Sequence, residues 1–294
     1  MKSWICILTI FVGISSCSLP NSNYPELEFI EIHQSDALHG VMFDLSGIVF
    51  IEDSLYVVAD KPWNKFLYGI HLSKGQFQVS HKKAIEINDP QLDLEGIDYC
   101  HGLIYLINER PGDIIAMHPD GSIQTLDLKF KGDNPPSNWG NAGWEGIAID
   151  CQNQIMYGLK EREPRGIYAI DMTNWKIRNS FNTPQIESND FADAKFENGY
   201  LYAIERNGCH IAKIDPKTEK VVSKYHYQHI ANTEQGKLFE PTPFGMGEAL
   251  LLTDDEIWVG LDNNGLKASP YAEETFGITG KAPVILRFKR PVDF

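Results

Sequence analysis

The chain has 294 residues, of which 43% are apolar, so it is long and apolar enough to bury a sizeable core. Acidic residues outnumber basic residues 40 to 26, and the formal net charge is −14. This surplus argues against nucleic acid as a partner, because phosphates require a basic surface, and it favours a soluble protein or one that binds cations.

The first 16 residues are expected to be a targeting segment outside the fold. Lys2 supplies a positive charge, and the apolar stretch at 4–13 is too short to cross a bilayer as a stable helix. The sequence Ile14-Ser15-Ser16-Cys17 that follows resembles the lipobox of bacterial lipoproteins, in which the cysteine becomes the lipidated first residue. An ordinary signal peptide cleaved near Ser16 is the alternative.

Lipidation of Cys17 would anchor the protein to a membrane, because each buried methylene of an acyl chain contributes about 0.8 kcal/mol. We therefore expect a lipid-anchored protein of the bacterial cell envelope. The domain organisation is then a signal peptide at 1–16, the lipidated cysteine and a flexible tether at 17–26, and one domain at 27–294. A monomer is expected.

A pattern of roughly 50 residues recurs along the remaining chain and is typical of an array of small sheets. Each copy has a polar residue followed by a small one, an apolar strand, a tight turn, a second apolar strand, and an acid. The copies begin at Ser46-Gly47, Glu95-Gly96, Glu145-Gly146, Asp193-Ala194 and Glu248-Ala249.

Each repeat is predicted to contain four strands, because β-branched and aromatic residues alternate between Gly, Asn, Asp and Pro turns. In the second repeat these strands are expected at 96–99, 103–108, 113–118 and 122–129. Four-stranded units in series, without long helices, predict an all-β fold, a β-propeller.

The fifth repeat has strands at 248–252, 257–261 and 284–289, after which the sequence supplies no fourth strand. The alternating segment 27–32 has the length to fill that place and so to close the ring by pairing the two ends of the domain. We therefore predict five four-stranded blades closed by the N-terminal strand, with six blades as the alternative.

The connections between strands are asymmetric. Turns such as Asn198-Gly199 and Asp254-Asp255 are short, whereas the connections expected on the opposite face are long. The long ones span 131–143, 182–190, 228–245 and 263–283. Long loops on a rigid scaffold commonly carry binding function, so we expect a ligand at the long-loop face.

Two rings of side chains are predicted to open onto that face. The inner ring begins the first strands: Ser46, Glu95, Glu145, Asp193 and Glu248. The second ring ends the second strands, with Asp60-Lys61, Glu109-Arg110, Glu161-Arg162, Glu205-Arg206 and Asp262-Asn263.

Converging carboxylates repel one another and require a cation, a proton or an arginine. Calcium suits them, being a hard ion with six to eight oxygen ligands, and we assign Glu95, Glu145, Asp193 and Glu248 as its ligands. Zinc is disfavoured because no His or Cys cluster falls on this face. His226 and His229, three apart on a predicted strand, would point to opposite sides.

A purely structural role accounts for the same pattern. A motif present in nearly every repeat is often a device of the fold, in which an acid accepts hydrogen bonds from neighbouring backbone N–H groups. The Glu-Arg pairs would then latch adjacent blades together. Departures from symmetry favour a site, since Ser46 lacks the acid and Asp262 lacks a following base.

The segments Asp93-Leu94-Glu95-Gly96-Ile97 and Asn141-Ala142-Gly143-Trp144-Glu145-Gly146-Ile147-Ala148 resemble the DxEGI and NxGxEGIA motifs of the phytase-like propeller family, also called "esterase-like activity of phytase". The resemblance covers most of residues 40–265. It implies a propeller with a calcium-dependent phosphoesterase or esterase activity. Glu95 and Glu145 are the two residues that match the motifs, and the resemblance points to them as catalytic.

In such an enzyme, calcium would activate a bound water and Arg110, Arg162 and Arg206 would hold the ligand's oxygens. The acidic total charge counts against a polyanionic substrate such as phytate. A glycosidase using paired channel carboxylates is a second hypothesis, in which Trp63, Trp139 and Trp144 serve as binding platforms for the ligand. A surface-anchored binding module without catalysis is the third. The ligand, a small molecule or a surface component, is not identified by the sequence.

Three cysteines remain beyond the targeting segment, and they lack metal-like CxxC spacing. Cys100 and Cys151 occupy matching turns in neighbouring repeats, so a disulfide between them is compatible with the pattern. Buried or turn thiols are the alternative.

Overall fold

The computed structural model describes residues 24–35, 43–186, 188–233, 236–239 and 246–294. The predicted targeting segment and Cys17 lie outside these residues. Twenty strands dominate the described chain, as the alternating pattern predicts. Among the described residues, no helix is long and apolar enough to cross a membrane.

Three sheets have four strands each, in consecutive order. Their strands are β6 (Leu94–Cys100), β7 (Leu103–Asn108), β8 (Asp113–Met117) and β9 (Ile123–Leu126); β10 (Trp144–Asp150), β11 (Ile155–Lys160), β12 (Gly166–Asp171) and β13 (Lys176–Phe181); and β14 (Ala194–Glu197), β15 (Tyr200–Glu205), β16 (His210–Asp215) and β17 (Lys220–His226). The second strand of the second repeat was predicted at 103–108, and these bounds are confirmed.

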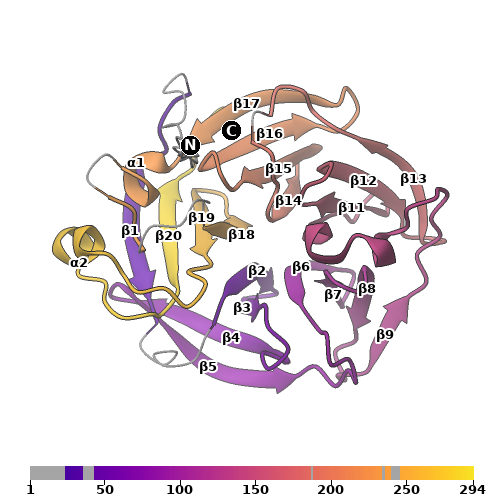
Figure 1. The fold of residues 1–294 in the computed structure, drawn as a ribbon, viewed down its shortest axis with the longest axis horizontal. Helices are drawn as coiled ribbons and strands as arrows, with labels where there is room; N and C mark the ends of the chain where they lie inside the picture. The colour runs from indigo at the N-terminus through magenta and orange to yellow at the C-terminus, as the bar shows by residue number, and fades with distance from the viewer. Residues whose placement is uncertain (1–23, 36–42, 187, 234–235, 240–245) are drawn as a thin grey trace, which may run out of the picture.

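The fourth sheet has eight strands in the order β18-β19-β20-β1-β5-β4-β3-β2. Its strands are β1 (Phe29–Gln34), β2 (Leu45–Ile51), β3 (Ser54–Ala59), β4 (Phe66–Ser73), β5 (Gln76–Ala84), β18 (Gly247–Leu252), β19 (Glu256–Leu261) and β20 (Val284–Lys289). Figure 1 shows the sheets arranged around a common axis, with β2, β6, β14 and β18 innermost. The chain is therefore all-β and propeller-like.

The N-terminal strand joins the two ends of the described domain. β1 pairs antiparallel with β20, and Ile32 lies opposite Leu286. Its other edge meets β5 through one parallel pair, Gln34 with Gln76. The predicted pairing of the N-terminal segment with the last strand is confirmed, although the strand covers 29–34 rather than 27–32.

The innermost strands contact one another around the axis, β2 with β6, β6 with β10, β10 with β14, β14 with β18, and β18 with β2. Glycines permit this approach. A Cβ on Gly146 would lie 2.5 Å from the carbonyl oxygen of Ala192, and one on Gly96 would lie 3.3 Å from the Cα of Gly146. The glycine of the repeated step is therefore required by the packing of neighbouring strands.

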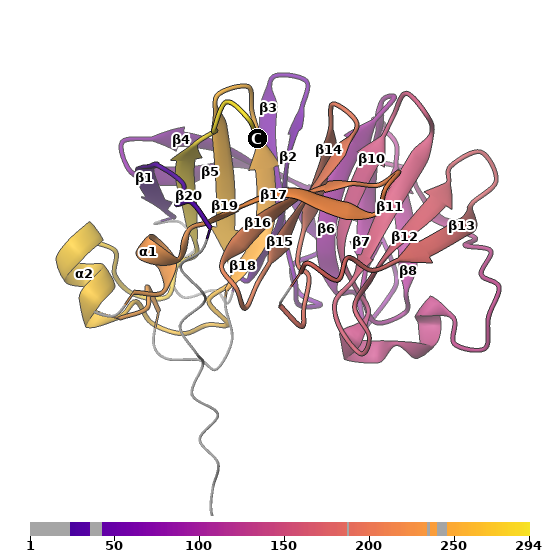
Figure 2. The ribbon, with the colours of Figure 1, turned by 90° about the horizontal axis from the view of Figure 1, so that it is seen from above.

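The two faces differ as predicted, with short turns on one and long connections on the other (Figure 2). The long connections contain two short α-helices, α1 (Gln228–Ala231) and α2 (Pro270–Phe276), and two 3₁₀ turns at Pro136–Asn138 and Gly140–Ala142. Helix α2 begins at Ser269, whose hydroxyl accepts a hydrogen bond from the backbone N–H of Ala272 at 3.1 Å.

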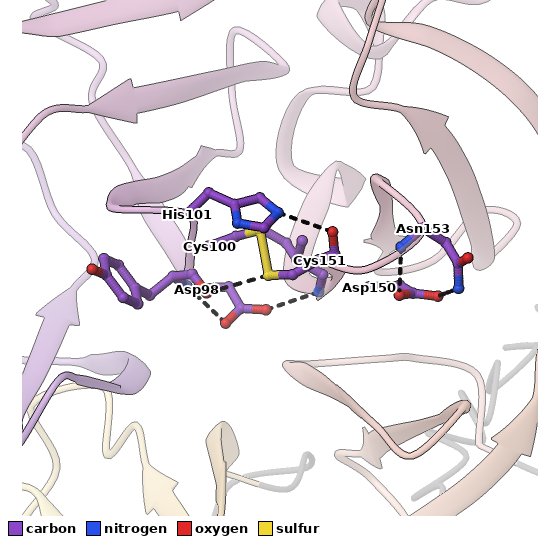
Figure 3. The surroundings of a disulfide bond; sticks show 8 residues. Asp98, Cys100, His101, Asp150, Cys151 and Asn153 are labelled. Carbon is purple, nitrogen blue, oxygen red and sulfur yellow. Dashed lines mark hydrogen bonds between the residues drawn. A yellow bond between two sulfur atoms is a disulfide. The ribbon is translucent and has the colours of Figure 1, made fainter.

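A disulfide joins the turn after β6 to the turn after β10 (Figure 3). Cys100 and Cys151 have Cα atoms 5.7 Å apart, within the usual range for a bridge. The bridge links two neighbouring sheets on the short-turn face. Of the two alternatives left by the sequence, the structure has the disulfide, and Cys209 is buried and takes no part in the bridge.

Candidate functional site: an acidic cavity on the long-loop face

Four of the innermost strands carry a β-bulge at the same place. The register of β6 against β7 shifts between Leu94 and Gly96, which leaves Glu95 as the extra residue. The same shift leaves Ser46, Glu145 and Glu248 as the extra residues of β2, β10 and β18. A bulge re-aims a side chain that regular pleating would direct elsewhere.

These bulges border a cavity of about 420 Å³, which we call the acidic cavity. Nine acids line it together with four bases and four asparagines. The acids are Asp60, Asp93, Glu95, Glu109, Glu145, Glu161, Asp190, Glu248 and Asp262; the bases are Lys61, Arg110, Arg162 and Arg206; the asparagines are Asn141, Asn189, Asn207 and Asn264. The predicted convergence of the two rings is thus present for most of their members.

Glu95 and Glu145 differ from the other acids of the cavity in lacking a partner. Neither carboxylate has a hydrogen bond or an ion pair with a described residue, although Glu145 is only 7% exposed. Burial raises the pKa of Glu145 well above its usual value, with Arg206 opposing and Glu248 adding to the shift. Burial and then repulsion from Glu145 likewise raise the pKa of Glu95. Two acids without a hydrogen bond or ion pair to a described residue therefore face the cavity, with Arg206 and Arg110 as the bases that act on them at longer range.

Two trios of carboxylates are close enough to share an ion. One oxygen each from Glu109, Glu145 and Glu161 lie within 4.8 Å of one another, and the same holds for Asp60, Asp93 and Glu95. Calcium ligands lie 2.3–2.6 Å from the ion, so two ligands of one ion are separated by at most about 5 Å. The second trio brings in Asp60 and Asp93, which the sequence analysis did not assign to calcium.

Other oxygens of the first trio leave room for a cation. Glu161 Oε2 is buried and accepts no hydrogen bond from a described residue, while its Oε1 faces Arg162 and Arg206. Glu109 accepts one bond from the backbone N–H of Gly143 at 3.3 Å. The donor set is all oxygen, which fits a hard divalent cation.

Arg206 is the main counter-charge on the opposite wall. Its guanidinium contacts Asp190 at 3.1 Å and Glu248 at 2.5 Å, and also pairs with Glu161. These partners come from three different sheets or their loops, so the arginine latches neighbouring sheets, as the structural interpretation of the sequence predicts. Burial tends to lower its pKa, but Glu248, Glu145 and other carboxylates raise it well above the usual value.

The remaining bases lie nearer the rim. Arg110 donates to Asp93 at 2.6 Å, and Lys61 contacts Asp44 at 3.1 Å and Asp60. Arg162 pairs with Glu161 and donates to the backbone carbonyl of Asn141 at 2.6 Å. The side chains of Arg110 and Arg162 remain 51% and 36% exposed, so both can reach a ligand entering the cavity.

Burial raises the pKa of three further acids of this cavity to about 7. These are Asp60, Glu109 and Glu248, and in each the loss of solvent is the largest cause. For Asp60 and Glu248 the neighbouring bases Lys61 and Arg206 act in the opposite direction. Keeping these carboxylates ionised and close together in the folded protein therefore costs free energy, and a bound proton or cation lowers that cost.

Asp193 is not part of this cavity. When the β14–β15 hairpin is compared with the β6–β7 hairpin, Asp193 occupies the position of Gly96 and Ala192 that of Glu95. The register expected from the sequence was therefore one residue off. Its buried carboxylate instead contacts Lys195 at 2.9 Å and accepts from the backbone N–H of Leu250 at 3.0 Å. A slip of one residue along a strand reverses the face to which a side chain points.

Trp139 and Trp144 also lie elsewhere than expected. Trp144 is fully buried and its indole N–H donates to the carbonyl of Gly112 at 3.1 Å. Trp139 is 9% exposed, donates to the carbonyl of Asn134 at 3.0 Å, and packs on Trp144 with ring centroids 4.8 Å apart. Both belong to the core between sheets and are not binding platforms.

Sequence reasoning missed Asp93 and Asp190 as cavity residues and Asp44 as the partner of Lys61. A signal was available for two of them, because Asp44 and Asp93 each precede the bulged residue by two positions. At that position the backbone carbonyl accepts from the acid that ends the second strand, for example Asp93 from Glu109 N–H at 2.9 Å. Asp190 lies in a loop without such a repeat.

His226 and His229 were predicted to lie on one strand, and the structure differs from that prediction. His229 lies in α1 and not on β17, and its ring centroid is 5.8 Å from that of His226. His210 adjoins His226 at 6.1 Å. The side chains of this cluster lie outside the acidic cavity, whose lining residues include no histidine.

Comparison with known proteins connects this geometry to a family. A sequence model of the SdiA-regulated family matches residues 25–227. No curated protein matches the chain in sequence.

Many solved structures resemble this fold, and two of them illustrate the likeness. The glutaminyl cyclase of Myxococcus xanthus is 11% identical with a TM-score of 0.58, covering 90% of this chain and 100% of its own. The virginiamycin B lyase of Staphylococcus aureus is 13% identical with a TM-score of 0.50, covering 89% and 99%. At these identities the likeness extends to the fold alone.

Proposed function

We propose that this chain, which belongs to the SdiA-regulated family, binds calcium in its acidic cavity and takes up a small polar ligand beside the ion. The observation that carries the proposal is Glu145. It is buried at a β-bulge, faces the cavity without a hydrogen-bonding partner among the described residues, and lies within ion-sharing reach of Glu109 and Glu161. A buried carboxylate in that position requires a cation or a proton.

The scaffold of this site is, in the proposal, a five-bladed propeller. Its support is the closed sequence of contacts among the five innermost strands, β2, β6, β10, β14 and β18. The eight-stranded sheet then consists of two blades joined at the edge where β1 meets β5 through a single residue pair. A six-bladed ring would need a sixth innermost strand, whereas these contacts run through five strands and return to the first.

Calcium suits the cavity better than zinc or magnesium. The donors are carboxylate and amide oxygens from several loops, and calcium accepts six to eight such ligands with adaptable geometry. Glu145 and Glu95 anchor the two trios, and Glu248 stands beside them, paired with Arg206. Asp193 has no part in this site.

The ligand is proposed to be polar and to carry an anionic or carbonyl oxygen. Calcium would hold that oxygen, and Arg110 and Arg162 would donate to it from the rim. The asparagines at the rim supply further amide donors and acceptors. Trp139 and Trp144 are buried, and Trp63, although 56% exposed, does not line the cavity, so none of the three offers a surface there for stacking a sugar ring. This counts against the glycosidase hypothesis.

Hydrolysis of an ester is a second candidate function. The observations that favour it are the position of Glu95 and Glu145 on the cavity wall and the direction of their pKa shifts, since burial raises both above their usual value and such carboxyl groups are common acids and bases in active sites. In that activity Glu145 would take a proton from a bound water while calcium neutralises the developing charge on the ester. The phytase-like motifs imply the same chemistry.

We also propose that the protein is anchored in the bacterial cell envelope through a lipid on Cys17. The disulfide between Cys100 and Cys151 supports an oxidising compartment, since such bridges are rare in the reducing cytosol. A Cys17→Ser variant should leave the membrane fraction and appear in the soluble fraction. Recovery of this variant in the membrane fraction would contradict the anchor.

Calcium titration tests the main proposal. We expect calcium, added to chelator-treated protein, to raise the thermal unfolding midpoint. At a concentration 100 times its Kd, calcium should increase the free energy of unfolding by about 2.7 kcal/mol. Glu145→Gln should abolish this shift, whereas Glu274→Gln, on the exposed face of α2, should retain it. An unfolding midpoint that calcium and chelator leave unmoved would overturn the proposal.

A panel of phosphate esters, acyl esters and aryl glycosides, assayed with and without calcium, separates catalysis from binding. Turnover that requires calcium and is lost in Glu145→Gln supports hydrolysis. If calcium binds and no member of the panel is turned over, the protein is a binding module for those classes.

A further inference from the structure

A second cavity, of about 610 Å³, lies at the other ends of the same innermost strands. We call it the short-turn cavity, since the turns after β10 and β14 form part of its lining. Its volume lies in the range of small-molecule sites. Its lining residues are distinct from those of the acidic cavity, so it is a separate site.

Apolar side chains form most of its walls. They are Val49, Phe50, Ile149, Phe196, Leu251 and Leu252. Phe50 is 38% exposed, one of few large apolar side chains with such exposure among the described residues. A ligand that covered these walls would gain about 25 cal/mol for each Å² of apolar surface removed from water.

One charged group lies in this apolar setting without full compensation. The carboxylate of Asp98 is held in place by the backbone N–H groups of Tyr99 and Ile149, each donating at 2.8 Å to a different oxygen (Figure 3). A carboxylate oxygen has two lone pairs, so each retains one acceptor site. The group is therefore oriented and able to accept further hydrogen bonds.

The nearby cation is already engaged. Lys195, which also lines the cavity, donates from Nζ to the carbonyl of Ile97 at 3.0 Å and to Asp193 at 2.9 Å. Burial raises the pKa of Asp98, and the charge of Lys195 offsets that effect only in part. The other acids of the lining are also occupied. Glu197 pairs with Arg290, and Asp150 caps the turn through Asn153.

We propose that the short-turn cavity binds an apolar molecule carrying one cationic group, of the protonated-amine class. The ammonium group would donate to Asp98, and the apolar body would lie against Phe50, Phe196 and the paired leucines. An anionic ligand is disfavoured because the acids of the lining, Asp98, Asp150 and Glu197, outnumber its one base, Lys195. The acidic cavity, by contrast, has few apolar walls to hold such a body.

The probes for this proposal are n-octylammonium, n-octanol and n-octanoate, which share a chain and differ in charge. Binding to the full protein at pH 7.5 is measured by calorimetry and by ligand-observed NMR. We expect octylammonium to bind at least tenfold more tightly than octanoate, with octanol between them. Absence of binding by octylammonium, or equal binding by octanoate, would overturn the proposal.

Variants locate the site. Phe50→Ser should weaken octylammonium and octanol alike, while Val222→Ser, an exposed apolar residue on β17, serves as the matched control and should leave both unchanged. Asp98→Asn should remove the preference for the ammonium over the alcohol. If Asp98→Asn does not fold, Phe50→Ser alone still tests where octylammonium binds. Unchanged octylammonium binding in Phe50→Ser would place the ligand elsewhere and contradict the proposal.

Discussion

The two ends of the innermost strands carry cavities of opposite character. On β6, Glu95 lies near the start of the strand and Asp98 near its end, only three residues apart, yet one opens onto nine acids and the other onto apolar walls. The β-bulge accounts for part of this difference, because it inserts an extra residue at one end only. A propeller-like scaffold can thus build two unlike sites from one set of strands.

The two ends are also held together in different ways. Ion pairs joining several sheets stabilise the long-loop end, whereas a disulfide and close backbone packing stabilise the short-turn end and the middle. The following changes test this contrast.

Removal of Arg206 should have the largest effect. Arg206→Ala leaves Glu161, Asp190 and Glu248 without their shared counter-charge, and breaking such a buried pair costs about 3–5 kcal/mol of unfolding free energy. Urea unfolding in calcium-free buffer measures the loss. Arg178→Ala, which removes an exposed pair with Asp171 on β12, is the control and should change little. Equal losses in the two variants would contradict the role assigned to Arg206.

Loss of the disulfide should have the next largest effect. The double variant Cys100→Ala, Cys151→Ala lacks the bridge, which joins residues 51 positions apart. Removing a native disulfide lowers the free energy of unfolding by about 2–4 kcal/mol. We expect the calcium-dependent shift in unfolding midpoint to persist in this variant, since the bridge lies on the short-turn face. A loss of the calcium response would show that the two ends are coupled.

Gly146→Ala should disturb the middle of the strands. The added methyl group would lie 2.5 Å from the carbonyl oxygen of Ala192, and such overpacking costs about 1–3 kcal/mol. Gly102→Ala, in the turn after β6, serves as a contrast: its Cβ meets no atom within 4 Å, and only its positive φ of 80° resists substitution. A larger loss in Gly102→Ala would contradict the packing argument.

The last test concerns protonation of the acidic cavity and is measured as a slope with pH instead of a loss in one variant. Asp60, Glu109 and Glu248 have pKa values near 7 in the folded protein and lower values when unfolded, so the folded state binds more protons between those limits. Stability of the calcium-free protein should therefore fall as pH rises from about 4.5 to about 7, by about 1.4 kcal/mol per pH unit for each proton difference. Urea unfolding at a series of pH values checks this.

Saturating calcium should flatten that pH profile, because the ion replaces the protons. Glu248→Gln should make the calcium-free profile shallower than that of Glu274→Gln. Stability that rises over this pH range in calcium-free buffer would contradict the assignment of raised pKa values.

Alternation and turn residues were sufficient to predict most strands, because each strand has one buried face and a local turn. The closure by the N-terminal strand was predictable by elimination, since the last repeat lacked a partner. The bounds of that strand shifted by two residues, because its pairing is settled by β20 and not by its own pattern.

The site was predictable only where the motif repeats. Glu95, Glu145 and Glu248 were found because a bulge follows the acid-glycine or acid-alanine step, whereas Asp193 was misassigned because β14 has no bulge and its register differs by one residue. The burial of Trp139 and Trp144 depends on contacts with Tyr168 and other distant residues, which local sequence does not reveal. The short-turn cavity has no motif at all.

The pairing of β1 with β20 has a consequence for how the chain is made. β1 is synthesised first and its antiparallel partner last, with Gln34 and Val284 separated by 250 positions of sequence. Loop-closure entropy makes such long-range pairing slow, so β1 remains unpaired along that edge until β20 has been synthesised. The contact that joins the first and last strands is therefore available to the chain only late in folding.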